Sequence, residues 1–275
     1  AMGASLSFSA SDDRLYFSAR VRSAHLEPLL ALIAEVLSDP SFPEQELATL
    51  KQREEANLAM QSQDTRAQAD IALSRMLFQK DHPHYGQTTE ESLKALQAIT
   101  QAQLHAYHSK INRRTLVFAA AGEVEHKAIF TLAEKYFKPL PDTKPTESKP
   151  LRAPAPTARK AAVFLPEKAS IDYMVGIAAG ITKDHPDYPA LMIGMNILGI
   201  PGFTGRLMQI VREKEGLTYG VYATANGFDP KTDGCLSVWG TFSPQLFERG
   251  RASILREIKR IVTEGVSAED ARKHS

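Results

Sequence analysis

The stretch LGIPGFTGRLMQIVREKEGLTYGVY, residues 198–222, carries the most specific signal in this sequence. It begins as a glycine-punctuated loop, continues with Leu207, Ile210 and Val211 at helical spacing, and ends in residues that favour a strand. Gly216 would let the chain reverse in the left-handed conformation that commonly ends a helix. The pattern predicts a loop–helix–strand unit whose helix packs on a sheet.

Two polar side chains of this unit are candidates for holding a ligand. Arg212 lies in the last predicted helical turns, and Tyr219 follows seven residues later, across the reversal. A guanidinium offers planar donors for carbonyl oxygens, and a phenolic hydroxyl can donate to an oxyanion, so the pair could grip a peptide backbone. The ordinary alternative is an arginine that covers apolar surface and a core tyrosine with a satisfied hydroxyl. In the strand that follows, Leu217, Tyr219 and Val221 are expected to point to one face, and Thr218, Tyr222 and Thr224 to the other.

The bulk composition is that of a packed protein. Of its 275 residues, 43% are apolar and 24% are charged, and the net charge of +1 argues against nucleic acid or an anionic membrane as the main partner. No apolar run reaches the ~20 residues of a membrane span, and the first ten residues lack a signal-peptide pattern. The single Cys235 excludes an intrachain disulfide and a multi-cysteine zinc site, and is expected as a small apolar residue on a strand.

Residues 1–140 predict a first α+β domain, the C-terminal part of a larger one. Alternation over 5–22 predicts a hairpin with Asp12-Asp13 at its turn, and 115–121 predicts a buried strand that ends at Gly122. Helical periodicity and two capping boxes, Thr88 with Glu91 and Thr100 with Gln103, predict helices at 26–37, 43–63, 71–78, 88 onward, 100 onward and 128–137.

A proline-rich linker, residues 141–159, leads to a second α+β domain at 160–275. Strands are predicted at 161–165, 173–181 and 236–242, and helices at 185–198 and 244–264. Leu191, Ile193, Met195 and Ile197 are expected to be largely buried. The fold class is therefore α+β: two similar domains, each an antiparallel sheet covered by helices, the second one truncated.

The histidines do not complete a metal site. His82 and His84 are expected in a surface turn, and His105 and His108 on a solvated helix. Residues 122–126, GEVEH, resemble the end of an H-x-x-E-H motif, but glycine occupies the first ligand position. A turn into a helix is the better interpretation, and no zinc site closes within this chain.

No other catalytic arrangement stands out. Glu46, Glu54 and Glu55 lie on a polar helix where surface carboxylates are ordinary. No nucleophile motif and no Walker-type phosphate loop occur in the sequence.

The residue pattern of the central stretch resembles that of a known protein family. An L-G…R-L run (Leu198-Gly199…Arg206-Leu207) and R-E-K-x-G-L-x-Y (Arg212 to Tyr219) resemble the R/Y signature of the insulinase/pitrilysin-type zinc peptidases, which include mitochondrial processing peptidase. An HPxYG-like turn at 82–86, the proline-rich linker and a helix that ends in an L-G loop follow the same order. The resemblance spans nearly the whole chain, although only the R/Y segment is specific.

In that family, two halves of two α+β domains each close around an unfolded peptide. One half carries H-x-x-E-H and a downstream glutamate, and the R/Y pair usually comes from the other. By this resemblance, Tyr219 would stabilise the oxyanion and Arg212 would hold a substrate carbonyl. The loop with Gly199, Gly202 and Gly205 would be a lip that meets substrate or the partner half.

The sequence departs from the active members of the family. H-x-x-E-H is absent, and Gln61 stands where a glutamate ligand would be expected. The resemblance thus implies a non-catalytic, substrate-binding half without a zinc ligand of its own, which forms a heterodimer with a partner that supplies zinc and the water-activating glutamate.

Two alternatives stay open. One is a fragment of a complete peptidase whose zinc motif lies upstream, since the chain is expected to open in mid-strand. The other is a structural subunit like the core proteins of a respiratory complex. The compartment is open too, although family habit favours the bacterial periplasm.

Overall fold

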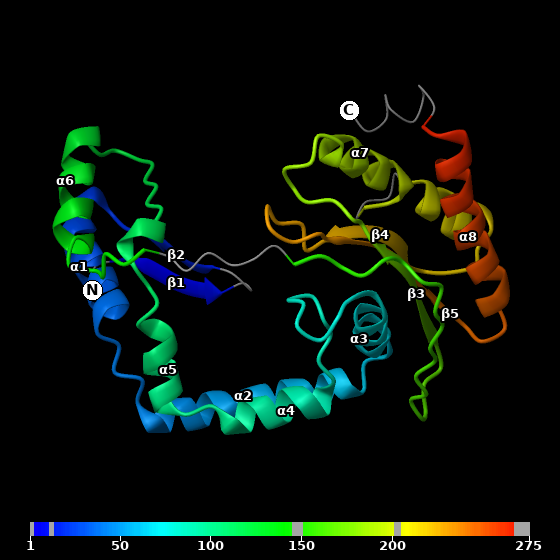
Figure 1. Ribbon diagram of the computed structural model, residues 1–275, viewed down its shortest axis with the longest axis horizontal. Coiled ribbons are helices and arrows are strands. Elements are labelled where there is room, and N and C mark those ends of the chain that lie inside the picture. Colours follow the sequence, from blue (N-terminus) through cyan, green and yellow to red (C-terminus); the bar gives the residue numbers. More distant parts are fainter. Residues whose placement is uncertain (1–2, 11–13, 145–150, 201–204, 267–275) are drawn as a thin grey trace. The chain divides into compact units, whose positions relative to one another are not determined.

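The computed structural model describes residues 3–10, 14–144, 151–200 and 205–266 (Figure 1). The chain forms two compact units. Unit 1 consists of Ala1–Glu54 and Ala95–Glu147, and unit 2 of Glu55–Lys94 and Ser148–Ser275.

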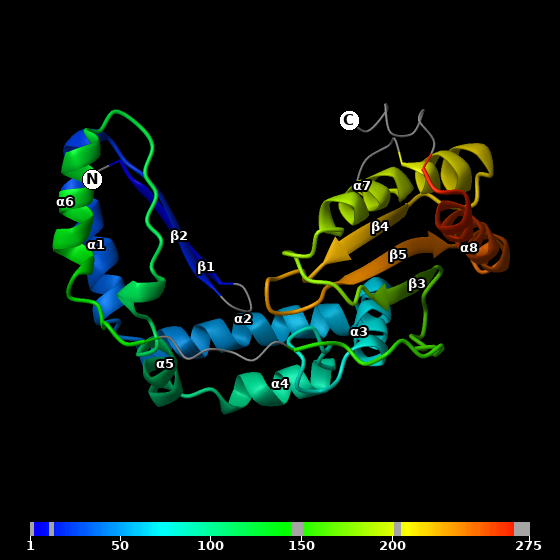
Figure 2. The ribbon, with the colours of Figure 1, turned by 45° about the horizontal axis from the view of Figure 1, so that its top comes forward.

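Unit 1 is built on two helices and a hairpin. Strand β1 (Ser5–Ala10) pairs antiparallel with β2 (Leu15–Arg20), which confirms the predicted hairpin, although its Asp12-Asp13 turn lies outside the described residues. Helices α1 (Leu26–Ser38) and α6 (His126–Phe137) lie side by side in both ribbon views (Figures 1 and 2). Their apolar faces, together with Leu140 just after α6, form the core of this unit, in which Leu29, Leu30, Ile33, Ala34, Leu37, Ile129, Ala133, Phe137 and Leu140 are buried.

The remaining helices of the first half follow the predicted order. They are α2 (Glu44–Ser62), α3 (Thr65–Leu77), α4 (Thr89–Ala98) and α5 (Gln101–His108). Both capping boxes form: the backbone N–H of Glu91 donates to Thr88 Oγ1 at 3.1 Å, and that of Thr100 donates to Gln103 Oε1 at 2.8 Å. Short 3₁₀ turns occupy Ser23–His25 and Arg113–Thr115.

Unit 2 contains a three-stranded antiparallel sheet in the order β3-β5-β4. The strands are β3 (Ile171–Ala178), β4 (Val221–Asn226) and β5 (Cys235–Phe242). Helix α3 lies on one side of this sheet, and α7 (Tyr188–Leu198) and α8 (Phe247–Glu264) lie on the other (Figure 2). This second side holds the core of the unit, made of Met195, Leu198, Leu207, Val211, Leu217, Val221, Ala223, Val238, Phe242 and Ile254.

The packing of α3 sets the extent of unit 2. Its leucine Leu73 is buried against Gly176 of β3, where a Cβ atom would lie 3.0 Å from the leucine Cδ2. Within the predicted linker, Leu151 forms a β-bridge with Thr232. Residues 55–94 and residues 151–159 of the predicted linker belong to unit 2. The sequence pattern instead predicts residues 1–140 as one domain and residues 141–159 as the linker.

Two predicted strands, 115–121 and 161–165, are wrong. Neither segment pairs with a strand among the described residues, and the side chains of Val117 and Phe164 are 87% and 88% exposed. Apolar alternation favours an extended backbone, but a strand also needs a neighbour that completes its ladder of hydrogen bonds. No helix in the described ranges is long and apolar enough to cross a bilayer.

Helix α7 differs in one detail from its prediction. Met195 and Ile197 are buried as expected, but Ile193 is 56% exposed. The helix packs only one face on the sheet, so an apolar residue two positions from a buried one can face outward.

Candidate functional site

The loop between α7 and the following helix is closed by two glycines. Gly199 follows α7 with a φ of 148°, and its carbonyl accepts a 2.7 Å hydrogen bond from the backbone N–H of Ala223 in β4. A Cβ atom on Gly205 would lie 2.4 Å from the Cα of Gly199. Only glycine at 205 allows the two ends of the loop to meet this closely. Gly202 lies outside the described residues.

The helix predicted after this loop is a π-helix, Met208–Lys214. The backbone N–H of Glu215 donates to the carbonyl of Ile210 at 2.9 Å, five residues back. Leu207 and Val211 are fully buried in the core of unit 2, so the predicted apolar face is confirmed. The wider turn, whose hydrogen bonds reach back five residues rather than four, gives no local sequence signal, because the same residue types form α-helices. π-Helical segments are rare in proteins, and those that occur are often found at functional sites.

Gly216 ends the π-helix in the left-handed conformation that the sequence predicts, with a φ of 62°. Its N–H donates to the carbonyl of Arg212 at 3.0 Å, and the next N–H, of Leu217, donates to Val211 at 3.0 Å. This is the nested pair of a Schellman cap widened by one residue. Arg212, half-buried, therefore has its backbone fixed in the last turn.

Tyr219 is displayed to solvent, with 91% of its surface exposed. The prediction that it shares one face with Leu217 and Val221 is wrong, as is the alternative of a core tyrosine, because those two neighbours are 3% and 0% exposed. Strand β4 begins only at Val221, so the alternation of a strand does not apply to residues 217–220.

The hydroxyl of Thr218 explains this break in the strand. It accepts a hydrogen bond from the N–H of Gly220 at 3.1 Å and donates to the carbonyl of Thr241 at the end of β5. The N–H of Thr241 in turn donates to the carbonyl of Gly220 at 3.1 Å. A threonine that bonds its own backbone two residues on forms a turn, and here the turn aims Tyr219 outward. Thr218 was not singled out from the sequence, although T-x-G is a usable signal for such a turn.

Aromatic packing stiffens the base beneath Tyr219. A Cβ atom on Gly220 would lie 3.0 Å from the ring of Trp239, whose Nε1 donates to Asp172 Oδ1 at 2.7 Å. The guanidinium of Arg66, from α3, lies 4.6 Å from the Trp239 ring and 4.8 Å from that of Tyr222. Contacts of this kind are attractive when the cation lies over the ring face.

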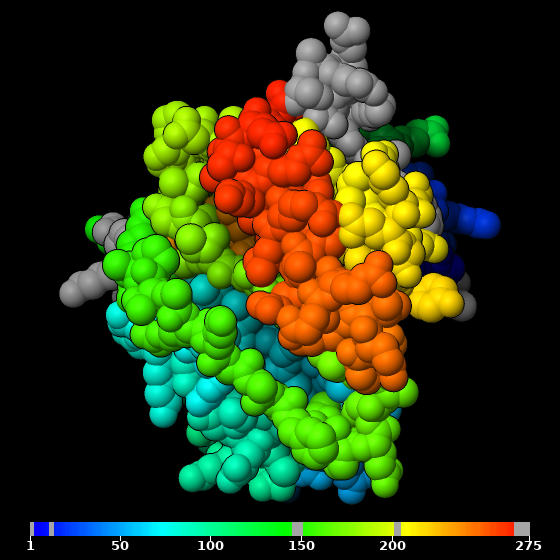
Figure 3. All heavy atoms as spheres, turned by 90° about the vertical axis from the view of Figure 1, so that its right-hand side faces the viewer, coloured from blue at the N-terminus to red at the C-terminus, as the bar shows by residue number. Residues whose placement is uncertain are grey.

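Helix α8 supports the other end of the segment. Figure 3 shows the orange and red atoms of α8 beside the yellow atoms of the π-helix. Arg256 of α8 forms an ion pair with Glu215, the residue after the π-helix, and donates through Nε to Glu257 at 3.2 Å. Glu257 is 1% exposed and also contacts Arg260 at 3.3 Å. The site thus rests on strands, on α3 and on α8.

The candidate metal-ligating residues lie outside the loop, π-helix and turn described above. Across the part of the chain that the structure describes, no three or more His, Cys, Asp or Glu residues are grouped so that they could hold a metal. Residues 122–126 lead into α6, which begins at His126.

The histidine predictions need one correction. His82 is not in a surface turn: it is 5% exposed, and its ring stacks on Phe78 with centroids 4.4 Å apart. His84 reaches the carbonyl of Gly227 at 2.7 Å. Contacts with a loop over 140 positions later bury this turn, and short-range patterns carry no information on them.

Three comparisons with known proteins define the class. The family model described as the peptidase M16 inactive domain matches residues 98–274, well over half of the chain. The chain belongs to this family of insulinase-like peptidases, and the matched part corresponds to its inactive domain.

Relatives support this assignment. The chain is 25% identical over 276 residues to an uncharacterized zinc protease of Mycobacterium leprae, covering 96% of this chain and 59% of that protein. A zinc protease of Mycobacterium tuberculosis is 26% identical over 261 residues, covering 92% and 58%. The chain thus spans less than two thirds of the length of these relatives.

Solved structures agree in fold. The peptidase M16 inactive domain of Pseudomonas fluorescens superimposes with a TM-score of 0.89 at 28% identity, over 99% of this chain and 66% of that one. A protease of Helicobacter pylori gives a TM-score of 0.83 at 18% identity over 99% and 65%, a likeness in fold alone.

Proposed function

We propose that this chain supplies a non-catalytic, substrate-binding half of a two-part zinc peptidase that acts on unfolded peptides. The observation that carries the proposal is Tyr219, a tyrosine 91% exposed on a turn whose backbone is fixed by Thr218 and Thr241. A large aromatic side chain on a rigid base loses little conformational entropy when it binds a partner. Membership in a family of peptidases through its inactive domain supports the same function.

Each residue of the proposed site has a role that its chemistry allows. The hydroxyl of Tyr219 donates to the oxyanion that forms on the scissile carbonyl. The guanidinium of Arg212 donates to a neighbouring substrate carbonyl. The glycines at 199, 202 and 205 let the loop approach a peptide backbone closely. Zinc and the base that activates water are expected in the partner half.

A kinetic test uses the enzyme assembled from the protein that carries this chain and its zinc-bearing partner. Cleavage of an internally quenched peptide is measured with Tyr219→Phe, which removes only the hydroxyl. We expect kcat to fall about 100-fold or more, the scale for one oxyanion donor. Tyr107→Phe is the matched control, because Tyr107 is a second exposed tyrosine, 68% exposed, on α5.

The arginine is tested in the same assay. Arg212→Gln should raise KM, and Arg249→Gln, an exposed arginine of α8, should not. Unchanged kinetics in both Tyr219→Phe and Arg212→Gln would contradict the proposal and favour a structural subunit.

A second candidate function is a part of one complete zinc peptidase. The observation in its favour is that the zinc proteases of Mycobacterium extend well beyond the matched span. The match covers 59% of the Mycobacterium leprae protein and 58% of the Mycobacterium tuberculosis protein. Elemental analysis of the full-length protein, purified without a partner, separates the two. We expect no stoichiometric zinc, whereas one zinc per chain would establish the second candidate.

A further inference from the structure

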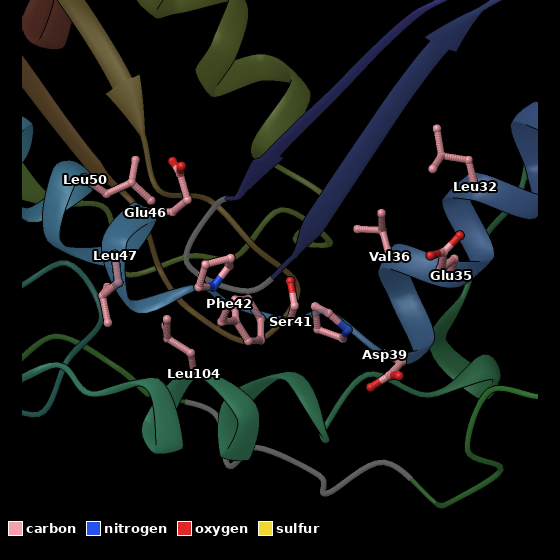
Figure 4. A pocket seen from close by; sticks show the side chains of 12 residues that line it. Leu32, Glu35, Val36, Asp39, Ser41, Phe42, Glu46, Leu47, Leu50 and Leu104 are labelled. Atoms are coloured by element: carbon pink, nitrogen blue, oxygen red, sulfur yellow. The ribbon is translucent and has the colours of Figure 1, made fainter.

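An open groove of about 330 Å³ lies within unit 1, where the chain turns from α1 into α2 (Figure 4). In this view Leu32 and Val36 rise from α1 on one side, Leu47 and Leu50 from α2 on the other, and Phe42 lies between them. Leu104 of α5 contributes to the wall. The volume is at the lower end of the range of ligand pockets and suits one or two apolar side chains.

The groove gathers apolar side chains that are open to solvent. Leu32, Val36 and Leu50 are 41%, 38% and 46% exposed. Single exposed leucines are normal, but here exposed apolar residues from two helices converge on one depression, which is a common arrangement at binding surfaces.

Phe42 is held in place at the centre of the groove. Its φ is 40°, in the left-handed region that a bulky residue rarely adopts. Its carbonyl accepts a hydrogen bond from Gln101 Nε2 at 2.9 Å, and its ring makes T-shaped contacts with the rings of His105 and His108 at centroid distances of 5.1 and 5.9 Å. A strained conformation persists only where the surroundings fix it, so the position of Phe42 in the groove is fixed.

The charges along the groove have a single sign. Among the twelve lining residues the charged ones are Glu35, Asp39 and Glu46, all exposed, and none of the twelve is basic. An apolar floor with a rim of carboxylates complements a ligand that has an apolar centre and positive flanks.

We propose that this groove binds a short peptide segment in which one large apolar side chain is flanked by lysine or arginine. The apolar side chain enters the groove against Phe42, and the basic side chains pair with the carboxylates of Glu35, Asp39 and Glu46. The inference does not depend on Arg212 or Tyr219, and it gives unit 1 a binding function of its own.

The test measures fluorescence anisotropy of labelled heptapeptides with the full-length protein. The probe has a central leucine between two arginines on each side. Replacing its arginines by glutamates, or its leucine by serine, should each weaken binding at least about tenfold. Raising the salt concentration from 0.05 to 0.5 M should weaken it too, because exposed charges are screened.

Two triple variants with the same change of charge locate the site. Glu35→Gln/Asp39→Asn/Glu46→Gln should weaken binding of the arginine peptide about fivefold to tenfold, as expected for three exposed ion pairs. Glu90→Gln/Glu123→Gln/Glu134→Gln removes three exposed carboxylates elsewhere and should leave it unchanged. Equal effects of the two variants would overturn the proposal.

A further variant tests whether the apolar side chains of the groove contact the central leucine of the peptide. Leu50→Ser, with its fold checked by circular dichroism, should weaken binding of the leucine peptide and leave that of the serine peptide unchanged. The proposal is also overturned if Leu50→Ser abolishes self-association in sedimentation, since the occupant is then a second copy. Failure of the full-length protein to bind any peptide would likewise overturn it.

Discussion

The Nε2 atom of His82 lies 3.5 Å from Oδ1 of Asp233, and both side chains are 2% exposed. His82 Nδ1 accepts a 3.1 Å hydrogen bond from the backbone N–H of His84, which assigns the proton of the neutral ring to Nε2, facing the carboxylate. Asp233 also accepts from the N–H of Ala153 at 3.0 Å. The pair therefore ties the 82–86 turn to the β4–β5 loop and to the chain that enters unit 2.

Stability should fall in mild acid because of His82. Burial, with the neighbouring His84 adding to it, lowers the pKa of His82 below 6.5. Between the lowered pKa and the pKa of about 6.5 in the unfolded chain, the unfolded state binds more protons, so the free energy of unfolding decreases as pH falls below about 6.5. Protonation of Nδ1 would also break its bond with His84. Urea unfolding between pH 8 and pH 5 measures this decrease.

The variant His82→Asn tests whether His82 causes this loss of stability in acid. It should be less stable than the parent at pH 8 but lose less further stability on acidification. His185→Asn, an exposed histidine of the same unit, should keep the parental slope. If the free energy of unfolding of His82→Asn depended on pH as strongly as that of the parent, the buried ring of His82 would not be the cause of the acid sensitivity.

Gly205→Ala should destabilise unit 2. Its Cβ atom would lie 2.4 Å from backbone of Gly199, which no side-chain movement can relieve. The expected cost is about 1–3 kcal/mol, the scale for overpacking. Gly194→Ala in α7 is the matched control, since its Cβ atom meets nothing within 4 Å, and it should stabilise by about 0.5–1 kcal/mol. Thermal unfolding compares the two, and similar melting temperatures would contradict the prediction.

The only thiol of the chain should be inert in the native state. Burial, together with the charge of Asp70, raises the pKa of Cys235 to about 11. At pH 8 the reactive thiolate is then about two orders of magnitude less abundant than for a free cysteine. Ellman's reagent should therefore react slowly with the folded protein and quickly in 8 M urea. Equal rates would show that the thiol is accessible and ionised.

Glu257→Gln should cost about 1–3 kcal/mol, because it removes the charge of a buried carboxylate that binds two arginines. Glu264→Gln is the control. It breaks the contact of Arg260 with an exposed carboxylate at 3.4 Å and should cost less than about 0.5 kcal/mol. Denaturant midpoints measure both variants, and a smaller effect at 257 than at 264 would be inconsistent with the prediction.

Much of the fold could be predicted because its signals are local. The hairpin, the order of the helices and both capping boxes depend on residues within a few positions of one another, and all of them form. Segments 115–121 and 161–165 carry the same kind of local signal, but their pairing depends on a neighbouring strand. The burial of His82 is not local either, since its partner Asp233 is 151 positions away.

The candidate site shows the same limit. The left-handed Gly216 and the buried Leu207 and Val211 follow from short patterns. The outward direction of Tyr219 depends on the bond between Thr218 and Thr241 in another strand, which the sequence around it does not show. The segment could therefore be located from the sequence, but the direction of its tyrosine could not.

Because of the π-helix, the direction in which the Arg212 side chain points depends on the number of residues in this segment as well as on which residues they are. A π-helical segment contains one residue more than the α-helix that would span the same ends. Removing one residue between Met208 and Lys214 would let the segment close as an α-helix and would turn the preceding side chains by about 100° relative to Gly216. Homologues whose lengths differ here by one residue would then present different faces of this helix to a ligand, even with the R/Y residues intact.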